Sequence, residues 1–445
     1  MIPPSSRALP RGARTALLIC VVAASLALIG LLVVVAPALA VVAAVLLMLV
    51  GVTVYEPVAL PVLAMPLFVI VERVGAGGVD LSLSDFAFFG AFWFAVFLGP
   101  RPFSPAMRNM LWLSAVYQAA TLFTVLVNPY LANTVEWFHA WLLVGGALVV
   151  GWAVGRSGHA ALGLTLLVGA CLVIAGLTLV FGALQFSQGN TGPVYLHWPF
   201  GMHKNFIGTL LASAAAIVYA RPPWMNWPLW VSYASFGALT LAVAATQARQ
   251  AYIGLAVAVV IILFRRHQKV RHTPWILAPV VVACVAVLTL VQEQVAEGNS
   301  FNSTYQRLTW FEQAIEVWQH QPVVGVGLRW WTTGEFYSFQ PPNAELEVLS
   351  STGIVGLVAF LVLQFGGLMV LWRVRPDYGT VAFAILASRL VQGQLDLFWV
   401  AVSVSVPYVI AGVCLGAAAR ADAEERSVEA APPEARHAPL TGSRT

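Results

Sequence analysis

The chain has 445 residues, of which 60% are hydrophobic and 9% are charged, and its formal net charge at pH 7 is +4. The low charged fraction and a mean hydropathy of +0.82 exclude a water-soluble globular domain, because such domains carry about a quarter charged residues. We therefore interpret the chain as an all-α, polytopic membrane protein in contact with lipid, and we expect no nucleic-acid partner.

Runs of about 20 apolar residues, the length that a helix needs to cross a bilayer, recur between residues 15 and 418. The first run is long enough to favour an uncleaved helix over a signal peptide. We expect about 12–14 membrane helices, because the second and third runs can be one broken element and the tenth is short. The candidate spans are 15–35, 38–55, 57–71, 84–99, 109–127, 137–155, 160–184, 204–220, 228–246, 251–264, 275–291, 353–372, 378–395 and 398–418.

The distribution of basic residues predicts the orientation, since arginine and lysine accumulate in short cytoplasmic loops. With both termini in the cytoplasm, 17 of the 23 basic residues fall on the cytoplasmic side. The protein is thus expected in the cytoplasmic membrane, with its functional face on the outer side. The other six basic residues fall on or near the outer side and are candidates for function: Arg73, Lys204, Arg249, Arg307, Arg329 and Arg389.

Two segments lack membrane character, an outer loop and a C-terminal tail rich in Ala, Pro, Glu and Arg that we expect to be disordered and cytoplasmic. In the loop, apolar side chains spaced by three to four residues between Ser303 and Pro322 predict an amphipathic helix. A Gly-x-Gly sequence then predicts a flexible turn before Trp330 and Trp331. The predicted parts are an N-terminus, 1–14; a helical bundle, 15–291; the outer loop, 292–350; C-terminal helices, 351–419; and the tail, 420–445.

Polar side chains gather at the predicted outer boundary, where a charge near lipid is costly and usually faces a water-filled cavity or a partner. They are His203, Lys204 and Asn205; Gln247, Arg249 and Gln250; Arg307, Glu312 and Arg329; and Arg389, Gln392 and Asp396, which share a face if their segment stays helical. Structural readings stay open: Lys204 can reach lipid headgroups, Arg389 can pair with Asp396, and Arg307 can face solvent. His203 has no second His or Cys at metal-binding spacing, and we expect no metal.

A cationic cavity on the outer face suits a lipid-linked diphosphate, because arginine binds phosphate oxygens with two parallel hydrogen bonds and lysine adds a point charge. The sequence contains neither a nucleotide-binding Gly-x-x-x-x-Gly-Lys loop nor a Rossmann fingerprint. The energy for a synthesis at this face would then come from an activated lipid carrier, and no cofactor is expected.

Four segments resemble the O-antigen ligase and O-antigen polymerase family of bacterial membrane glycosyltransferases, over roughly residues 195–400. They are "PFGMHKNFIG", "ATQARQAYIGLAVAV", "YQRLTWFEQAIEVWQHQPVVGVGL" and "PNAELEVLSSTGIVGLVAF". The resemblance implies a GT-C-like membrane fold with one large extracytoplasmic loop. It also implies metal-independent transfer of a glycan from undecaprenyl diphosphate to a sugar hydroxyl of a glycan or glycolipid acceptor in polysaccharide biosynthesis.

By this resemblance Arg249 and Arg307 match two arginines of the family, and Lys204 lies where the family often has a basic or polar residue. The family motif His-Asn-x-x-Leu-x-x-Leu-x-x-x-Gly-x-x-Gly is matched at Asn343 and the positions after it, but Pro342 replaces the His that is the family's candidate to activate the acceptor. Another residue then takes that role, or the acceptor differs, or the activity is lost.

The nearest replacements for that His are Glu345, Glu347 and His203. Because Glu345 and Glu347 point about 200° apart on a helix, at most one faces a cavity, and we favour Glu345. The predicted catalytic residues are therefore Arg249, Arg307, Glu345 and His203. The predicted substrate-binding residues are Lys204, Asn343, Arg329, Arg389, Trp330 and Trp331, with Tyr337 as a further sugar-stacking aromatic.

Two other functions stay open. A polyprenyl-phosphate-sugar transferase would use acidic, metal-binding residues in the first outer loop, where Glu72, Asp80 and Asp85 lie without a paired-carboxylate motif. A non-catalytic transporter of lipid-linked glycans, or an accessory protein descended from the ligases, would explain Pro342. The sugar, the acceptor, and the distinction between ligase and polymerase are not encoded in these motifs.

Overall fold

A computed structural model describes residues 51–74, 81–266, 303–399 and 401–430, with isolated positions before residue 51. Contacts divide the chain into two units, Met1–Leu60 and Pro61–Thr445, and the description below concerns the second. The predicted spans 15–35 and 275–291, most of span 38–55, and the end of the tail lie outside the described residues.

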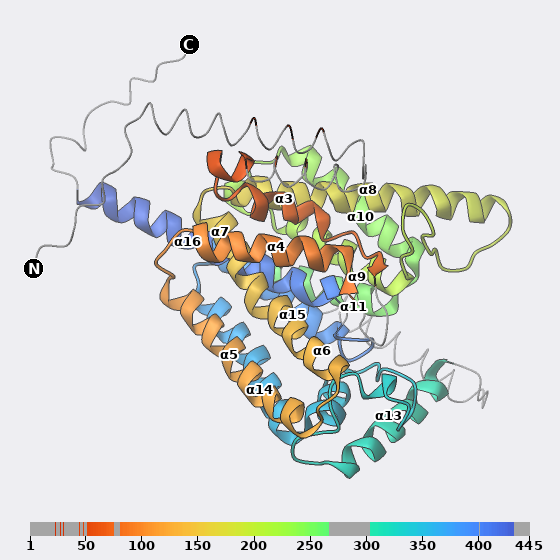
Figure 1. Cartoon of the computed structure of the whole chain (residues 1–445). Coiled ribbons are helices and arrows are strands. Elements are labelled where there is room, and N and C mark those ends of the chain that lie inside the picture. The colour runs from red at the N-terminus through yellow and green to blue at the C-terminus, as the bar shows by residue number, and fades with distance from the viewer. Residues whose placement is uncertain are drawn as a thin grey trace, which may run out of the picture. The chain divides into compact units, whose positions relative to one another are not determined.

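The described residues are almost entirely helical, which confirms the predicted fold class (Figure 1). Two short strands, β1 (Arg73–Val74) and β2 (Leu81–Ser82), pair antiparallel. The helices are α3 (Ala59–Leu67), α4 (Leu83–Leu98), α5 (Pro105–Val127), α6 (Leu131–Trp141), α7 (Ala147–Arg156), α8 (Ala160–Ser187), α9 (Lys204–Ala220), α10 (Leu229–Thr246), α11 (Arg249–Arg266), α13 (Ser303–His320), α14 (Ala344–Arg373), α15 (Pro376–Gln392) and α16 (Ala401–Glu429).

Among the described residues, six helical segments are long and apolar enough to cross a membrane. One of them joins α6 and α7 through a π-helical turn, Leu142–Gly146, into a 26-residue span. The shorter helices α4 and α9 are also apolar. The chain is thus a multi-pass membrane protein. The amphipathic segment of the outer loop is helical as predicted and forms α13.

Helices α7 and α16 approach each other closely because each carries two glycines four residues apart (Figure 1). A Cβ atom added at Gly151 would lie 2.1 Å from the carbonyl oxygen of Val409, and one at Gly412 would lie 2.3 Å from that of Leu148. Such small-residue repeats let helix backbones pack in direct contact inside membranes. The pair α7–α16 therefore forms a tightly packed part of the core.

The tail prediction was wrong over residues 420–429, because α16 continues as a helix to Glu429. One ion pair within α16 and one between α16 and the start of α15 lie in this last part of the helix. Arg420 pairs with Glu424 one turn later at 2.7 Å, and Arg375 at the start of α15 pairs with Glu425 at 2.8 Å. The composition of this segment suggested disorder, but its charged residues are spaced to pair along one helix and with the start of α15.

Replacing Gly151 by Leu should destabilise the protein by about 1–3 kcal/mol, because the side chain has no space between the two backbones. Thermal unfolding in detergent measures the effect. The matched control is G169L on α8, where an added Cβ meets no atom within 4 Å. Equal melting temperatures for G151L and G169L would contradict the packing described here.

Candidate active site

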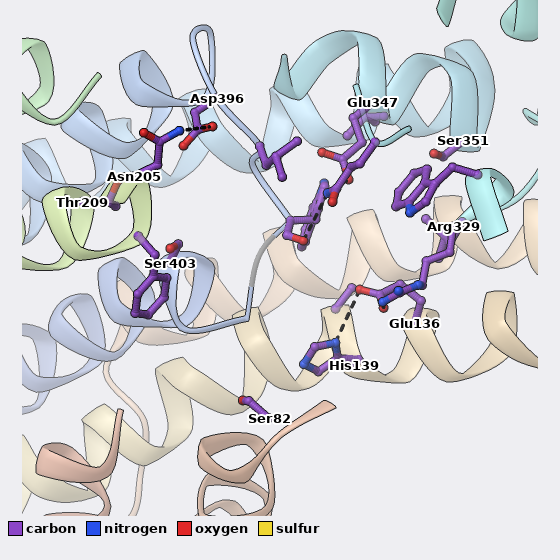
Figure 2. Close-up of a pocket in the computed structure, with 18 of the residues that line it drawn as sticks. Ser82, Glu136, His139, Asn205, Thr209, Arg329, Glu347, Ser351, Asp396 and Ser403 are labelled. Carbon is purple, nitrogen blue, oxygen red and sulfur yellow. Dashed lines mark hydrogen bonds and ion pairs between the residues drawn. The ribbon is translucent and has the colours of Figure 1, made fainter. Parts of the chain in front are cut away.

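A cavity of about 550 Å³ lies among α5, α6, α9, α14, α15, the start of α16, the β1–β2 region and the loops before α9, α14 and α16 (Figure 2). Its polar groups form two clusters. Asp396 and Asn205 lie at one end, with His203 close enough to interact with Asp396, and Glu347, Arg329, Glu136 and His139 lie at the other, called below the Asp396 end and the Glu347 end. The two clusters come from segments that are far apart in sequence.

At the Asp396 end, one carboxylate connects two helix starts. Its Oδ1 accepts a hydrogen bond from Nδ2 of Asn205 at 3.0 Å, and its Oδ2 accepts one from Nε2 of Gln250 at 3.1 Å. Helix α15 ends at Gln392, so Asp396 does not share a helical face with Arg389 as the sequence spacing suggested. Instead, Asp396 lies in the loop after α15 and binds the first turns of α9 and α11.

Three of the predicted cationic residues are brought to this end. Lys204 immediately precedes Asn205, Arg249 immediately precedes Gln250, and Arg307 of α13 interacts electrostatically with both Asp396 and Arg249. Burial lowers the pKa of Arg307 below its usual value, repulsion by Arg249 adds to this, and attraction by Asp396 opposes it. Arg249, Arg307 and Lys204 lie beside the Asp396 end and are outside the residues that form the cavity wall.

His203 caps the start of α9, where its Nδ1 accepts a hydrogen bond from the backbone N–H of Asn205 at 3.3 Å. Partial burial lowers the pKa of His203, the charge of Lys204 adds to this, and Asp396 opposes it. The imidazole also packs edge-on against Tyr195. His203 thus lines the cavity at the Asp396 end, with one ring nitrogen already used in the helix cap.

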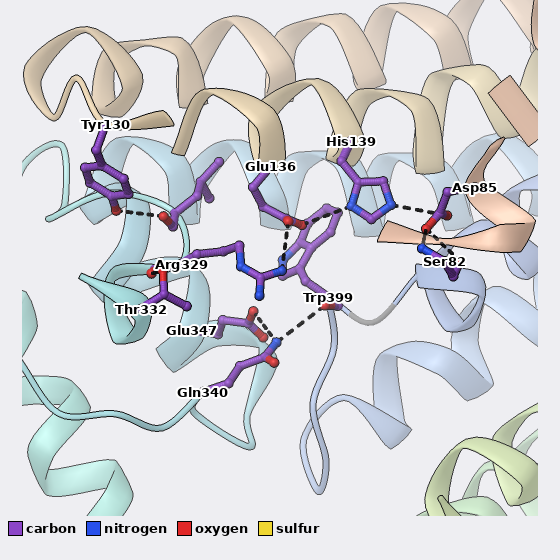
Figure 3. A network of polar contacts seen from close by, with 11 residues as sticks. Ser82, Asp85, Tyr130, Glu136, His139, Arg329, Thr332, Gln340, Glu347 and Trp399 are labelled. Carbon is purple, nitrogen blue, oxygen red and sulfur yellow. Dashed lines mark hydrogen bonds and ion pairs between the residues drawn. The ribbon is translucent and has the colours of Figure 1, made fainter. Parts of the chain in front are cut away.

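At the Glu347 end, four charged residues follow one another across three segments (Figure 3). Nε2 of His139 lies 3.2 Å from Oδ1 of Asp85, its Nδ1 lies 3.4 Å from Oε1 of Glu136, and Oε2 of Glu136 lies 3.5 Å from Nη1 of Arg329. Each imidazole nitrogen faces a carboxylate, which only accepts hydrogen bonds, so the ring satisfies both carboxylates when it carries both protons. The row therefore alternates negative and positive charge.

Arg329 is held at the cavity by the segment before it, which docks onto a break in α14. Gly353 interrupts α14 with φ +66° and ψ −166°, a conformation reserved for glycine. The break leaves two carbonyls and two N–H groups of α14 to be paired outside the helix, and the segment 322–327 pairs with all four at 2.9–3.2 Å. The N–H groups of Val326 and Gly327 donate to the carbonyls of Ser350 and Ser351. The N–H groups of Ile354 and Val355 donate to the carbonyls of Pro322 and Val323. The Gly-x-Gly turn is thus hydrogen-bonded to α14, which corrects the prediction of a flexible turn.

The same segment is held from its other side by the turn between α5 and α6. The Tyr130 hydroxyl donates to the carbonyl of Leu328 at 2.7 Å, Oδ1 of Asn133 accepts from the N–H of Leu328 at 2.9 Å, and Nδ2 of Asn128 donates to the carbonyl of Gly325 at 3.0 Å. Arg329 itself has a left-handed backbone with φ +59°. Its position is therefore set by contacts on both sides.

The two glutamates of α14 point in different directions, as expected for a helix, and Glu347 rather than the expected Glu345 faces the cavity. Asn343 caps α14 through a hydrogen bond from the N–H of Leu346 to its Oδ1 at 3.0 Å, which fixes where the helix begins. Glu347, 3% exposed, lines the cavity. Glu345 accepts a hydrogen bond from Gln394 at 2.8 Å and is outside the cavity wall, as is Asn343.

Of the predicted sugar-stacking aromatics, only Trp331 lines the cavity. Trp330 is fully buried, and its Nε1 donates to the Ser350 hydroxyl at 3.2 Å, so it packs the loop onto α14. Tyr337 donates to Glu316 of α13 at 2.7 Å. Trp399, which the sequence did not single out, lines the cavity and stacks on Tyr117 at 5.5 Å between ring centroids.

Arg389 reaches the cavity wall, but its guanidinium is used structurally. It is 3% exposed, donates to the carbonyls of Leu397 and Phe398, and lies over the Phe398 ring. These contacts fold the α15–α16 loop back and thereby place Asp396. A direct role for Arg389 in binding substrate stays a prediction.

The sequence reasoning missed Glu136, His139 and Tyr117, which line the cavity from α5 and α6. Glu136 and His139 stand three residues apart in an otherwise apolar span, and ionisable groups inside a membrane helix usually mark a functional site. That signal was available in "NTVEWFHAW". Of the acidic residues considered for the first outer loop, Asp85 pairs with His139, Glu72 lines the cavity, and Asp80 is outside the described residues.

The described part of the chain contains no group of three or more His, Cys, Asp or Glu side chains arranged to hold a metal ion.

Replacing His139 by Ala should destabilise the protein by about 3 kcal/mol, because Asp85 and Glu136 would then be buried without the cation between them. Denaturant unfolding in detergent measures this. H197A, at an exposed loop position, is the control. The double variant D85N/H139A should be more stable than H139A, because one of the uncompensated charges is also removed. A double variant no more stable than H139A would contradict this account.

Replacing Gly353 by Ala should cost about 1–3 kcal/mol, because the backbone conformation disfavours a side chain and a Cβ would lie 2.3 Å from the carbonyl of Val323. Limited proteolysis should also cut the 322–329 segment faster once it separates from α14. G334A, also at positive φ but with open space around the Cβ, separates the packing effect from the backbone effect. Unchanged cleavage in G353A would argue against the docking.

A comparison with protein families matches a part of the chain that contributes to the cavity. Residues 234–361 match the family model described as O-antigen ligase, and this range includes Arg249, Arg307, Arg329, Glu347 and the break at Gly353. A search of curated proteins gave no match. The resemblance to the O-antigen ligases is therefore confirmed over residues 234–361 of this multi-pass, all-helical membrane protein.

Proposed function

We propose that the protein is a membrane glycosyltransferase that transfers a glycan from a polyprenyl-diphosphate carrier to a sugar hydroxyl of an acceptor. The family match over residues 234–361 supports the ligase type of reaction. The active site would face the outer side of the cytoplasmic membrane, with both termini in the cytoplasm, as the basic residues predict.

The grouping of charges around Asp396 carries the proposal. Asp396 binds Asn205 and Gln250, the residues next to Lys204 and Arg249, and attracts Arg307, so α9, α11 and α13 each carry a cationic residue beside one end of the cavity. Arg249 and Arg307 repel each other, and an anionic ligand between them would replace that repulsion by attraction. A diphosphate has the charge and the oxygen geometry for two arginines and a lysine.

These cations would also assist the chemical step. As the bond between the anomeric carbon and the diphosphate oxygen breaks, negative charge grows on the leaving diphosphate. Fixed guanidinium groups stabilise that charge more in the transition state than in the ground state. The carrier lipid would extend into the bilayer from the Asp396 end, and the glycan would lie in the cavity, where Trp331 and Trp399 offer faces for sugar rings.

Replacing Arg249 or Arg307 by Ala should reduce glycan transfer by about 100-fold or more, because each variant loses a charge at the developing anion. Transfer is measured in proteoliposomes with lipid-linked glycan extracted from a strain that lacks this protein. R249K should recover only part of the activity, since lysine cannot bind two oxygens in parallel. R101A, an exposed arginine that contacts the carbonyl of Val96, is the control. Full activity of R249A would refute this assignment.

The lipid-linked products in that strain distinguish ligase from polymerase. Loss of a polymerase leaves single repeat units on the carrier, whereas loss of a ligase leaves long chains. Two results together would favour a transporter or accessory protein instead: the strain accumulates no lipid-linked glycan, and the purified protein consumes no donor.

A further inference from the structure

Glu347 is an ionisable side chain placed deep in the cavity wall, at the end opposite Asp396 (Figure 2). It lies one turn into α14, after the Asn343 cap, and is 3% exposed. An ionisable group is costly to place in such surroundings and is seldom kept there without a role. Glu347 is therefore the cavity residue whose position most requires an explanation.

The carboxylate is held by one oxygen only. Oε1 accepts a hydrogen bond from Nε2 of Gln340 at 2.8 Å, and the same amide also donates to the carbonyl of Trp399 at 3.4 Å (Figure 3). The backbone of Phe398 and Trp399 also stabilises the carboxylate, whereas Oε2 is buried and has no hydrogen-bond partner of standard geometry in the described structure. Buried polar atoms are nearly always paired in native proteins. Gln340 thus orients the carboxylate and leaves one oxygen available.

The neighbouring cations are directed at other acceptors. Arg329 forms its ion pair with Glu136, which is itself paired with His139 and interacts electrostatically with Glu347. Arg389 donates to the carbonyls of Leu397 and Phe398. Within the described ranges Glu347 has no ion pair of its own. The second carboxylate oxygen is thus not bound by an arginine in the described structure.

We propose that Glu347 is the general base that accepts the proton of the acceptor hydroxyl. This inference rests on the proposed function. The acceptor oxygen forms a bond to the anomeric carbon of the donor sugar, the bond from that carbon to the diphosphate breaks with its electron pair going to the diphosphate, and the hydroxyl proton moves to Oε2 of Glu347. The diphosphate leaves at the Asp396 end beside Arg249 and Arg307.

The other candidate bases are less well placed. Glu345 faces Gln394 outside the cavity. His203 lies at the Asp396 end with the donor, and its Nδ1 already caps α9. Pro342, where the resemblance leads one to expect a His, is buried and is outside the cavity wall. Two separate ends, one for the diphosphate and one for the base, let the reacting carbon lie between them.

The test compares E347Q with E345Q, which make the same change two residues apart on α14. E347Q should lower transfer in the proteoliposome assay by about 100-fold or more, while both variants bind undecaprenyl diphosphate as the unmodified protein does. E345Q should stay within threefold of the unmodified protein. E347Q that transfers within threefold of the unmodified protein, or E345Q that loses 100-fold, overturns the inference.

If E347Q no longer binds undecaprenyl diphosphate, E347A with sodium formate decides the question. Formate can enter the space left by the side chain and supply a carboxylate. At least tenfold recovery of transfer by formate supports a proton-accepting role, and no recovery overturns it. If the unmodified protein itself transfers no glycan, the proposed function fails. If it transfers and R249A does not, while E347Q remains active, only the inference about Glu347 fails.

Discussion

The break in α14 at Gly353 is the constraint on which the rest of the site depends. A helix interrupted inside a membrane protein leaves backbone groups without partners, and here the segment 322–327 binds those groups. Because that segment ends two residues before Arg329, the break helps to fix where the arginine lies. The turn between α5 and α6 holds the same segment from its other side and carries Glu136 on the helix that follows. The outer loop and the helical bundle are thereby joined around one cavity.

Two charged groupings at this cavity differ in how their charges are arranged. The row Asp85–His139–Glu136–Arg329 alternates in sign, so each charge is compensated by its neighbour. Near Asp396, Arg307 is attracted by the carboxylate and repelled by Arg249, an arrangement to which the proposed function assigns an anionic ligand. Glu347 belongs to neither arrangement. The proposed reaction needs both environments close together: cations for the leaving group, which gains negative charge, and a carboxylate for the hydroxyl, which loses a proton.

Much of the fold followed from the sequence, because long apolar runs and the spacing of apolar residues directly report helices. Span 160–184 corresponds to α8, span 204–220 to α9, and the amphipathic segment to α13. The site was harder to predict from the sequence. Asp396 could not be placed because its role depends on where α15 ends, and Glu347 could not be chosen over Glu345 because helical spacing separates the two without saying which faces inward. The docking of residues 322–327 is a tertiary contact that no local pattern encodes.

A structure determined with undecaprenyl diphosphate bound tests the central claim most directly. The account predicts that the diphosphate lies between Arg249 and Arg307 beside Asp396, with its terminal phosphate directed into the cavity toward Glu347. A diphosphate bound at Arg329 beside Glu136, or on the side of the membrane that carries Arg375 and Arg420, would contradict the division of the cavity into a donor end and an acceptor end.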